Sequence, residues 1–506
     1  MNSPQVAASR KDTRSVTPSS AEAASALTVQ SLVAGASLPS QRRAPLFDPA
    51  RGQRIGEVEL AGSEQVELAV AAAQGALAAW SSRPVIERSR VLMRYAAALE
   101  ADKEHIAALI TREHGKPRAD ALGSLQRGME VVEFATAATQ LLKGEHSDAV
   151  ARGVSTRSVK RPLGVCLGIV PFNYPAMIPL WMFPLALVCG NTFILKPSEK
   201  TPSAANRLAE LLTDAGAPAG VLNVLHGDAQ TVELLLEHPG IASVSFVGSS
   251  VAARSVYTLA SQQGKRVQAL GGAKNHAIVM PDADPIRVVE GLINGAFNSA
   301  GQRCMAVSVA VMVGTAYDQF MPLIDSAARK LRTGPGEDAT TEVPPLQSGA
   351  QKERILGMLT HSVQEGAHLS LDGRAVKVAA EYKDGYYLGP TIVDKVQRSM
   401  RVYTEEVFGP VLVVLRASSL VEAIAIANEH PLANGAVLFT RSGGDAAIFE
   451  RDIQCGMPGV NVAVPSPVAY HSFGGWRTSM WGDLAMHGPD AINFYTRRQV
   501  LTSRWT

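Results

Sequence analysis

From Val165 onward the chain alternates short apolar segments with helical segments, and this alternation constrains the fold more than any other feature of the sequence. Strands that are apolar along their whole length and separated by helices are typical of a parallel sheet covered on both faces. One expected helix, Ser203–Ala215, ends at Gly216, a common helix stop. The expected strands are Val165–Val170, Thr192–Leu195, Leu222–Leu225, Ala242–Phe246, Arg266–Leu270 and Ala277–Met280.

A second alternating set runs from about Pro285 to Arg441 and includes the apolar segments AVSVAVMVG and PVLVVL. Two long helices precede both sets: Val85–Glu113, which ends before a Gly-Lys-Pro stop, and Ala119–Leu142, which carries Arg127. The pattern predicts an α/β protein with two parallel-sheet domains of comparable size.

The two ends of the chain and the segment before Val165 lack this alternation of strands and helices. The first forty residues are rich in Ala and Ser with few acids, which predicts a disordered tail or, as a second reading, a transit peptide. Arg157–Arg161 and Phe494–Thr506 alternate apolar and polar residues, as edge strands do. Since exposed edge strands must be paired or covered, we expect subunit contacts at both segments.

Composition excludes several classes of protein. Among 506 residues the formal net charge is only +2 and no long basic run occurs, which argues against a nucleic-acid partner. The four cysteines form no CxxC pair and no Cys/His cluster, so we expect no structural zinc and a reducing compartment. The most apolar stretch, Ala176–Cys189, is too short to span a membrane and contains two prolines.

Common nucleotide and hydrolase signatures are absent, among them GxGxxG, GxxxxGK, GxSxG and HExxH. The best nucleophile candidate is Cys304, in FNSAGQRCMAVS, between an expected helix and an expected strand. Arg303 beside it would favour the reactive thiolate, and Gly301 would let the backbone approach a ligand. The alternative reading is a buried structural cysteine, which is also our reading of Cys166 and Cys189.

Three polar segments follow expected strands, where parallel sheets bind ligands. Asn173, in PFNYP, offers a neutral amide donor for an oxyanion, or simply holds a proline-bounded turn. Lys196 and Glu199 could grip the hydroxyls of a ribose, or form a solvated turn. Glu405 and Glu406 precede a Gly-Pro turn, where acids often form a solvated face.

The order and spacing of six motifs resemble the aldehyde dehydrogenase superfamily from about Pro45 to the C-terminus. The motifs are EHGKP, PFNYP, LKPSEKTP, FVGSS, GQRC and EEVFGP. Longer segments, including GKRVQALGGAKNH and FYTRRQVLTSRW, resemble the coenzyme A-acylating methylmalonate-semialdehyde dehydrogenase branch. The resemblance implies a Rossmann-like NAD-binding domain over 41–152 and 164–283, a catalytic domain over 284–470, and oligomerisation arms over 153–163 and 488–506, with a tail over 1–40.

The resemblance also implies roles for individual residues. Cys304 would attack the aldehyde, and the Asn173 side chain with the Cys304 backbone N–H would stabilise the oxyanion. Lys196 and Glu199 would hold the adenosine ribose of NAD, and the carboxylate would disfavour a 2′-phosphate. The remaining cofactor contacts would come from Glu406 at the nicotinamide ribose, Phe172 at the nicotinamide end, and Gly248 and Ser249 at the pyrophosphate.

One position departs from the hydrolytic members of the superfamily. Their general-base glutamate occurs in an ELGG motif, which here reads Ala269-Leu270-Gly271-Gly272, and no acid occurs between Glu237 and Asp282. A thioester on Cys304 would then wait for a better nucleophile than water, which favours the thiol of coenzyme A as co-substrate. A distant glutamate that enters the site in three dimensions is the alternative.

The branch oxidises semialdehydes that carry a carboxylate, such as 2-methyl-3-oxopropanoate or 3-oxopropanoate, with loss of carbon dioxide. Arg127 and Arg303 match the positions that clamp this carboxylate in the branch, and a guanidinium suits a carboxylate geometrically. The resemblance implies a homodimer or homotetramer in the cytoplasm, or in the mitochondrial matrix of a eukaryote. The alternatives are a hydrolytic aldehyde dehydrogenase for another aldehyde and a non-catalytic relative.

Overall fold

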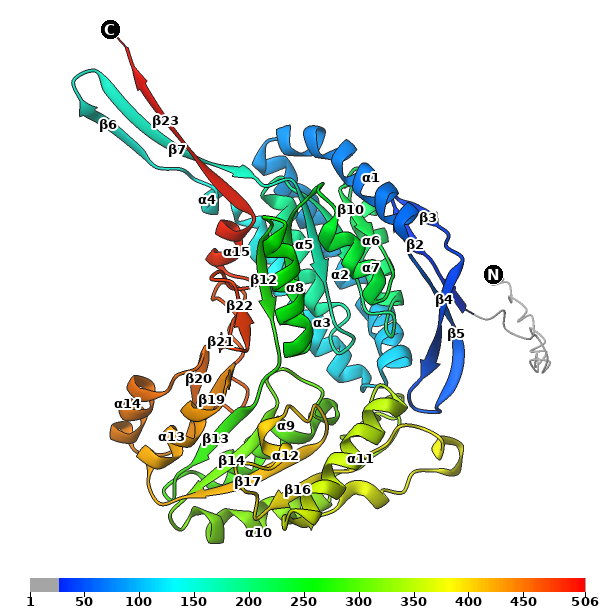
Figure 1. Cartoon of the computed structure of the whole chain (residues 1–506), viewed down its shortest axis with the longest axis vertical. Helices are drawn as coiled ribbons and strands as arrows, with labels where there is room; N and C mark the ends of the chain where they lie inside the picture. The colour runs from blue at the N-terminus through cyan, green and yellow to red at the C-terminus, as the bar shows by residue number, and fades with distance from the viewer. Residues whose placement is uncertain (1–26, 506) are drawn as a thin grey trace, which may run out of the picture.

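The computed structural model describes residues 27–505 as two α/β units, each with its own sheet, and a narrow arm that projects from the first unit (Figure 1). The first sheet has the strand order β22-β12-β11-β8-β9-β10-β2-β3. Its strands from β12 to β10 run parallel, while β22 and β2 join this core antiparallel. The bounds are β2 Ser31–Val33, β3 Ala36–Leu38, β8 Val165–Ile169, β9 Thr192–Lys196, β10 Leu222–Val224, β11 Ile241–Val247, β12 Arg266–Leu270 and β22 Met480–Trp481.

Helices pack on both faces of this sheet, which explains why its central strands are apolar along their whole length. α2, α3, α5 and α6 share one hydrophobic core with the sheet, and α1, α7 and α8 pack on the opposite face. The bounds are α1 Ser63–Ser82, α2 Val85–His114, α3 Arg118–Thr136, α4 Ala138–Leu141, α5 Met177–Val188, α6 Ser203–Asp214, α7 Ala229–Glu237, α8 Ser250–Gln262 and α15 Pro489–Phe494.

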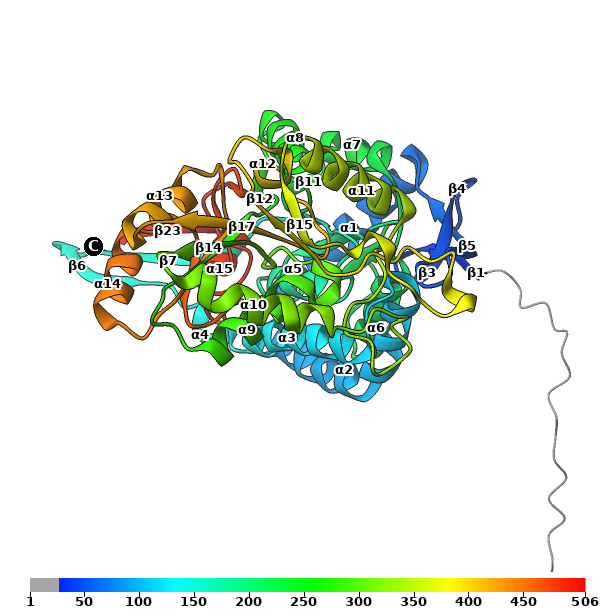
Figure 2. The same cartoon turned by 90° about the horizontal axis from the view of Figure 1, so that it is seen from below.

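The second sheet has the order β15-β16-β17-β14-β13-β19-β20 and encloses a separate hydrophobic core with its helices. Only β15 at its edge is antiparallel. Seen from below (Figure 2), α9 of this unit lies near α3 of the first unit, and residues of both helices line one cavity. The bounds are β13 Asn275–Val279, α9 Pro285–Phe297, β14 Val307–Val313, α10 Ala316–Arg329, α11 Gly349–Gln364, β15 His368–Leu371, β16 Thr391–Asp394, α12 Arg401–Thr404, β17 Val411–Ala417, α13 Leu420–Glu429, β19 Gly435–Phe439, α14 Gly443–Asp452 and β20 Met457–Val460.

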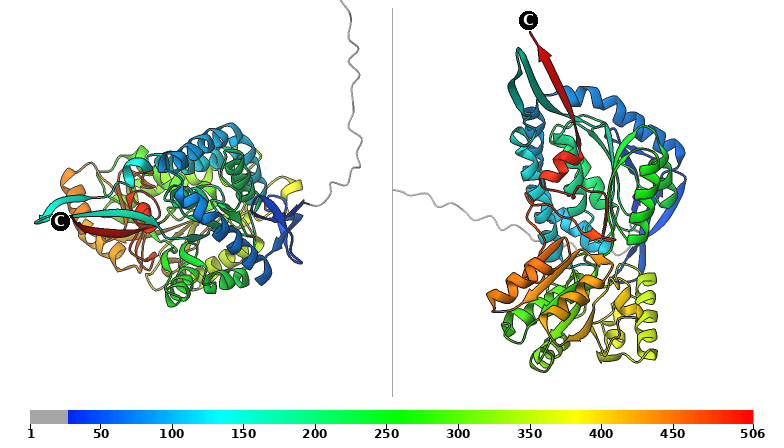
Figure 3. Two further views of the ribbon diagram at one scale, coloured as in Figure 1. Left: turned by 90° about the horizontal axis from the view of Figure 1, so that it is seen from above. Right: turned by 60° about the vertical axis from the view of Figure 1, so that its left-hand side comes forward.

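The arm is a three-stranded antiparallel sheet of β23 (Thr496–Arg504), β7 (Val154–Pro162) and β6 (His146–Ala151). It extends beyond both units in every view (Figures 1 and 3). The two segments expected to be edge strands therefore pair with each other inside one chain. Two small sheets complete the described fold: β1 (Leu27–Val29), β5 (Gln53–Leu60) and β4 (Arg42–Asp48), and β18 (Leu432–Ala433) with β21 (Trp476–Arg477).

The predicted class, two parallel-sheet α/β domains, is confirmed, but several boundaries are wrong. The predicted tail over 1–40 is wrong for 27–40, which carry β1, β2 and β3, while residues 1–26 lie outside the described residues. The predicted first domain, 164–283, includes β13, which belongs to the second sheet, so the boundary falls between β12 and β13. β6 lies in the arm rather than in the first domain, and the helix expected over Ala119–Leu142 is divided at Ala137 into α3 and α4.

Candidate active site

Three loops at the carboxyl ends of β8, β9 and β11 line one cavity of about 440 Å³. Lys196 and Glu199 lie in it, with 3.8 Å between Nζ and Oε2, and Phe172 and Ser249 also line it. Burial lowers the pKa of Lys196, against the raising effect of Glu199. Parallel sheets bind nucleotides at this end, so the predicted ribose residues lie where a ribose would be bound.

The first turn of α8 also borders this cavity. Ser249 is the N-cap of α8, and its Oγ accepts a hydrogen bond from Ala252 N at 3.3 Å. The opening turn of the helix extends into a neighbouring cavity at Ser250 and Val251, and Val251 is 83% exposed. A helix N-terminus that faces an open groove attracts anions, so these residues fit a dinucleotide pyrophosphate without a glycine-rich fingerprint.

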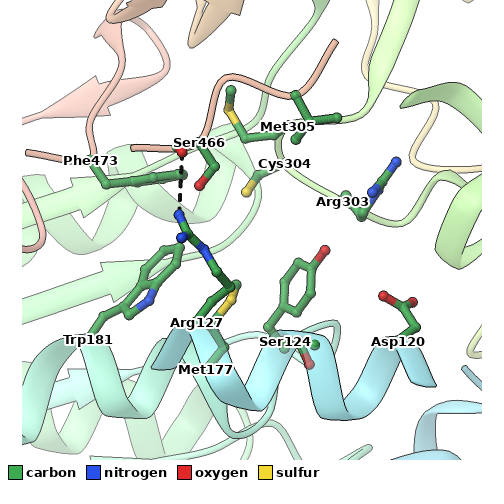
Figure 4. Close-up of a pocket in the computed structure, with 13 residues that line it drawn as sticks. Asp120, Ser124, Arg127, Met177, Trp181, Arg303, Cys304, Met305, Ser466 and Phe473 are labelled. Atoms are coloured by element: carbon green, nitrogen blue, oxygen red, sulfur yellow. Dashed lines mark hydrogen bonds between the residues drawn. The ribbon is translucent and has the colours of Figure 1, made fainter. Parts of the chain in front are cut away.

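Cys304 lies where two further cavities meet, one of about 400 Å³ and one of about 610 Å³. The larger one shares Phe172 and Ser249 with the ribose-side cavity, so the groove is continuous along the sheet ends as far as Cys304. The smaller one contains Arg127 on the far side of the cysteine (Figure 4). The free cysteines Cys166, Cys189 and Cys455 are buried and line neither cavity.

A strained segment presents Cys304. After α9, the residues Ser299, Ala300 and Gly301 all have positive φ, at 53°, 51° and 66°. A Cβ atom at Gly301 would lie 2.1 Å from Gly409 O, so the residue must be glycine. The close approach that the structure shows at Gly301 is to the backbone of EEVFGP.

The electrostatics of Cys304 differ from the sequence prediction. Burial, together with the nearby Glu406 carboxylate, raises the pKa of the Cys304 thiol to about 12, and the lowering effect of Arg303 does not outweigh them. The Arg303 guanidinium donates to Asn294 O and Gly295 O at the end of α9 and is turned away from the thiol (Figure 4). Arg303 alone therefore does not maintain a thiolate here.

The two arginines expected to clamp a carboxylate line the same cavity but are held differently. Arg127 Nη1 donates to Glu130 at 2.8 Å, and Nη2 donates to Pro467 O at 2.8 Å and Ser466 O at 3.4 Å. Its guanidinium lies within the cavity (Figure 4). Only Arg127 thus presents its charge to the space beside Cys304, and the clamp role of Arg303 stays a prediction that this geometry does not favour.

Asn173 borders the cavity on the cofactor side of Cys304. Its Nδ2 donates to Gln302 O at 3.1 Å, and its buried Oδ1 accepts no hydrogen bond from the described residues. The side-chain amide is therefore bonded to the residue two positions before Cys304, and Asn173 and Cys304 line the same cavity. This placement suits the predicted oxyanion role.

Glu406 is a half-buried acid that lines this groove. Its Oε1 accepts from Ala273 N at 3.0 Å, and burial raises the pKa of the Glu406 carboxyl to about 7, against the lowering effects of this hydrogen bond and of Lys274. A Cβ atom at Gly272 would lie 2.5 Å from Glu406 Oε2, so this glycine makes room for the carboxylate. Ala269, at the expected general-base position, is fully buried and lines none of these cavities.

Comparisons with known proteins agree with this geometry. The model of the aldehyde dehydrogenase family matches residues 37–501. The chain belongs to the aldehyde dehydrogenase family. It is 47% identical over 465 residues to the malonate-semialdehyde dehydrogenase of Pseudomonas aeruginosa, covering 92% of this chain and 93% of that protein.

Solved structures of other proteins show the same fold. The methylmalonate-semialdehyde dehydrogenase of Oceanimonas doudoroffii is 46% identical with a TM-score of 0.93, covering 95% of this chain and 98% of that chain. PnpE in complex with NAD is 31% identical with a TM-score of 0.91, and PnpE from Pseudomonas sp. WBC-3 is 31% identical with a TM-score of 0.90; each match covers 94% of this chain and 98% of that chain.

Several residues of this aldehyde dehydrogenase site were missed from the sequence. Lys116 and Lys274 are fully buried lysines that donate to backbone carbonyls of the catalytic loops. Both lie inside the quoted motifs EHGKP and GGAKNH, so the motif letters were the available signal. Trp181 and Phe473, whose ring centroids are 4.7 Å apart, form an aromatic wall of the cavity that holds Arg127.

Within residues 27–505, no group of three His, Cys, Asp or Glu side chains could hold a metal ion. No helix in that same range combines the length and apolar character of a membrane span.

Proposed function

We propose that this chain is an NAD-dependent, coenzyme A-acylating dehydrogenase of malonate or methylmalonate semialdehyde, and that it releases carbon dioxide with acetyl-CoA or propanoyl-CoA. The observation that carries the proposal is the position of Cys304 between two cavities, one with Arg127 and one with the dinucleotide-binding features. A short substrate with an aldehyde at one end and a carboxylate at the other fits between the thiol and the guanidinium. The semialdehyde relatives at 46–47% identity support the same substrate class.

In this proposal the residues act in a fixed order. The Cys304 thiolate attacks the aldehyde carbon, and Asn173 Nδ2 with the Cys304 backbone N–H stabilises the oxyanion. NAD, when bound, supplies a hydride acceptor. Lys196 and Glu199 hold its adenosine ribose and Glu406 its nicotinamide ribose. The bound cofactor then covers Cys304 on the cofactor side of the groove.

The acylating step follows from what the site lacks. Ala269 offers no carboxylate to activate water. The acyl group of the Cys304 thioester is therefore transferred to the thiol of coenzyme A, and Cys304 is released as a thiol. Loss of the substrate carboxylate as carbon dioxide leaves a carbanion, which takes up a proton equivalent to the one that the Cys304 thiol gave up, so the acyl group has two or three carbons and atoms and charge balance. Coenzyme A is a substrate here, and Phe172 and Ser249 remain cofactor contacts in the same proposal.

A hydrolytic aldehyde dehydrogenase is the second candidate, and one observation favours it. Glu406 is an acid near Cys304 with a pKa of about 7, which suits a general base. Its hydrogen bond from Ala273 N restrains it on the cofactor side of the groove, where it fits a ribose partner better.

The deciding experiment follows NADH absorbance with malonate semialdehyde and NAD, with and without coenzyme A. Without it, we expect formation of about one NADH per active site and then arrest; with it, sustained turnover. Cys304→Ser should form no NADH, whereas Cys455→Ser, a buried cysteine outside the cavities, should retain full activity. Equal steady rates with and without coenzyme A would overturn the acylating proposal and favour hydrolysis.

We further propose that the arm of β6, β7 and β23 mediates a homodimer or homotetramer, since Val150, Val500, Leu501 and Trp505 on it are exposed apolar residues. The four free cysteines support a reducing compartment such as the cytoplasm.

A further inference from the structure

The EHGKP motif carries no reactive group of the proposed mechanism, yet it contacts three other segments: PFNYP, the start of α6 and the loop at Pro345. It forms the end of α2, which Gly115 terminates in the left-handed conformation with φ of 87°. Glu113 accepts hydrogen bonds from Ser203 N and Oγ at the start of α6, just beyond the ribose-side loop. A Cβ atom at Gly115 would lie 2.6 Å from Pro345 Cγ, so the second unit packs directly on the motif.

Lys116 makes the contact with the catalytic loop. Its side chain is fully buried, and Nζ donates to Asn173 O at 2.7 Å. The same Nζ lies 4.1 Å from the ring centroid of Tyr174, a cation–π contact with the next residue of the loop. One ammonium group therefore fixes two consecutive residues of PFNYP.

Burying an ammonium costs free energy unless its partners compensate, and here the pKa of Lys116 falls to about 8 because of burial. The partners that offset this cost are the Asn173 carbonyl and the Tyr174 ring. If Asn173 or Tyr174 moved away, the Lys116 ammonium would remain unpaired in a dry interior. Because this is costly, Lys116 strongly restrains the positions of both residues.

The restraint reaches the nucleophile in one further step. Asn173 is 3% exposed, and its Nδ2 donates to Gln302 O at 3.1 Å, two residues before Cys304. We propose that Lys116 is a positioning residue that fixes the Asn173 backbone, so that the Asn173 amide meets the oxyanion formed on Cys304. The inference rests on the proposed function, because it assumes that an aldehyde adds to Cys304. A misplacement of about 1 Å at such a donor costs on the order of 100-fold in rate.

The test compares two reactions of Cys304. Aldehyde addition forms an oxyanion, whereas alkylation by iodoacetamide does not, so only the first needs Asn173. In Lys116→Met we expect the pre-steady-state NADH burst with malonate semialdehyde to slow by about 10- to 100-fold, with the alkylation rate of Cys304 unchanged within about twofold. Asn173→Ala should show the same pattern, and the double variant should be no slower than Asn173→Ala alone.

Lys265 provides the matched control. It is also a buried lysine, and its Nζ donates to His238 O at 2.7 Å and Ile241 O at 3.2 Å, outside the three cavities of the groove. Lys265→Met should leave both reactions unchanged. If Lys116→Met does not fold, Lys116→Gln, which keeps an N–H donor without the charge, takes its place in the same cycle.

Three results would contradict the positioning role of Lys116. They are an unchanged rate of the NADH burst in Lys116→Met, a loss of burst rate that adds to that of Asn173→Ala in the double variant, and equal losses of burst rate and alkylation rate in Lys116→Met. Absence of a burst in the wild-type protein would instead refute the proposed function, so the two failures are distinguishable.

Discussion

Replacing Arg127 by Met tests whether this side chain recognises the carboxylate of the substrate. The guanidinium has five N–H donors, and three of them are used, one toward Glu130 and two toward the carbonyls of Pro467 and Ser466. Two donors remain for an anion in the cavity that Cys304 also lines. Met keeps much of the side-chain volume and removes only the charge and the donors.

The magnitude follows from the environment of the guanidinium. A hydrogen bond to a charged group contributes about 1.5–3 kcal/mol, and two donors are available. The Arg127 side chain is 35% exposed and Glu130 already neutralises part of its charge, so solvent and this pair reduce the sum. About 2–3 kcal/mol remains, which corresponds to a fall of about 30- to 150-fold in kcat/KM for malonate semialdehyde.

The assay compares malonate semialdehyde with propanal, which is of similar size and has no carboxylate. We expect kcat/KM for propanal to change by less than about threefold in Arg127→Met, because the neutral aldehyde uses no charge contact. Arg303→Met is the companion variant: its guanidinium contacts the carbonyls at the end of α9, so any loss should affect both substrates equally. A fall of the same size for both substrates in Arg127→Met would refute the carboxylate assignment.

Three further predictions concern charge and assembly. The folded pKa of Glu406, about 7, lies above its ordinary 4.5, so the contribution of Glu406 to stability falls as pH rises from about 4.5 to 7; the Tm of the wild type relative to that of Glu406→Gln should therefore fall over this range, and a constant difference in Tm would contradict it. NAD should accelerate iodoacetamide alkylation of Cys304, roughly three- to fourfold for each unit by which its cationic ring lowers the thiol pKa from about 12, because the thiolate fraction rises while its nucleophilicity falls; an unchanged rate at saturating NAD would count against its proposed position. Deletion of residues 497–506 removes the partner strand of β7 and should yield a smaller assembly in light scattering, with an unchanged mass arguing against the arm as the interface.

The strands of both sheets could be predicted because burial on two faces leaves a local signature. β8 and β9 are buried at every residue, and such runs are recognised without knowledge of their neighbours. Which sheet a strand joins is not local: β12 and β13 are equally apolar and nearly adjacent, yet they lie in different sheets, and the predicted boundary missed this. β1, β2 and β3 have only three residues each, too few to show a period.

The candidate site was predictable to the level of motifs and not to the level of side-chain direction. The motifs brought Asn173, Glu406 and Cys304 to one groove, as expected. The role of Arg303 depended on where its guanidinium points, and adjacency in sequence does not determine that. The effect of its charge on the thiol also depended on burial, which here outweighs it.

Two buried lysines show how this site differs from a set of reactive groups on flexible loops. Lys116 holds the carbonyl of Asn173, and Lys274 holds the carbonyls of Val402 and Glu405 at 2.6 and 2.8 Å, next to Glu406. Loops form few backbone hydrogen bonds of their own and are therefore less rigid than helices and strands. A buried donor from a neighbouring element can restrain the loop backbone instead. Because an ammonium in a dry interior has no alternative partner, it specifies one loop position rather than several. The motifs without reactive chemistry, EHGKP and GGAKNH, thereby determine where the reactive residues lie.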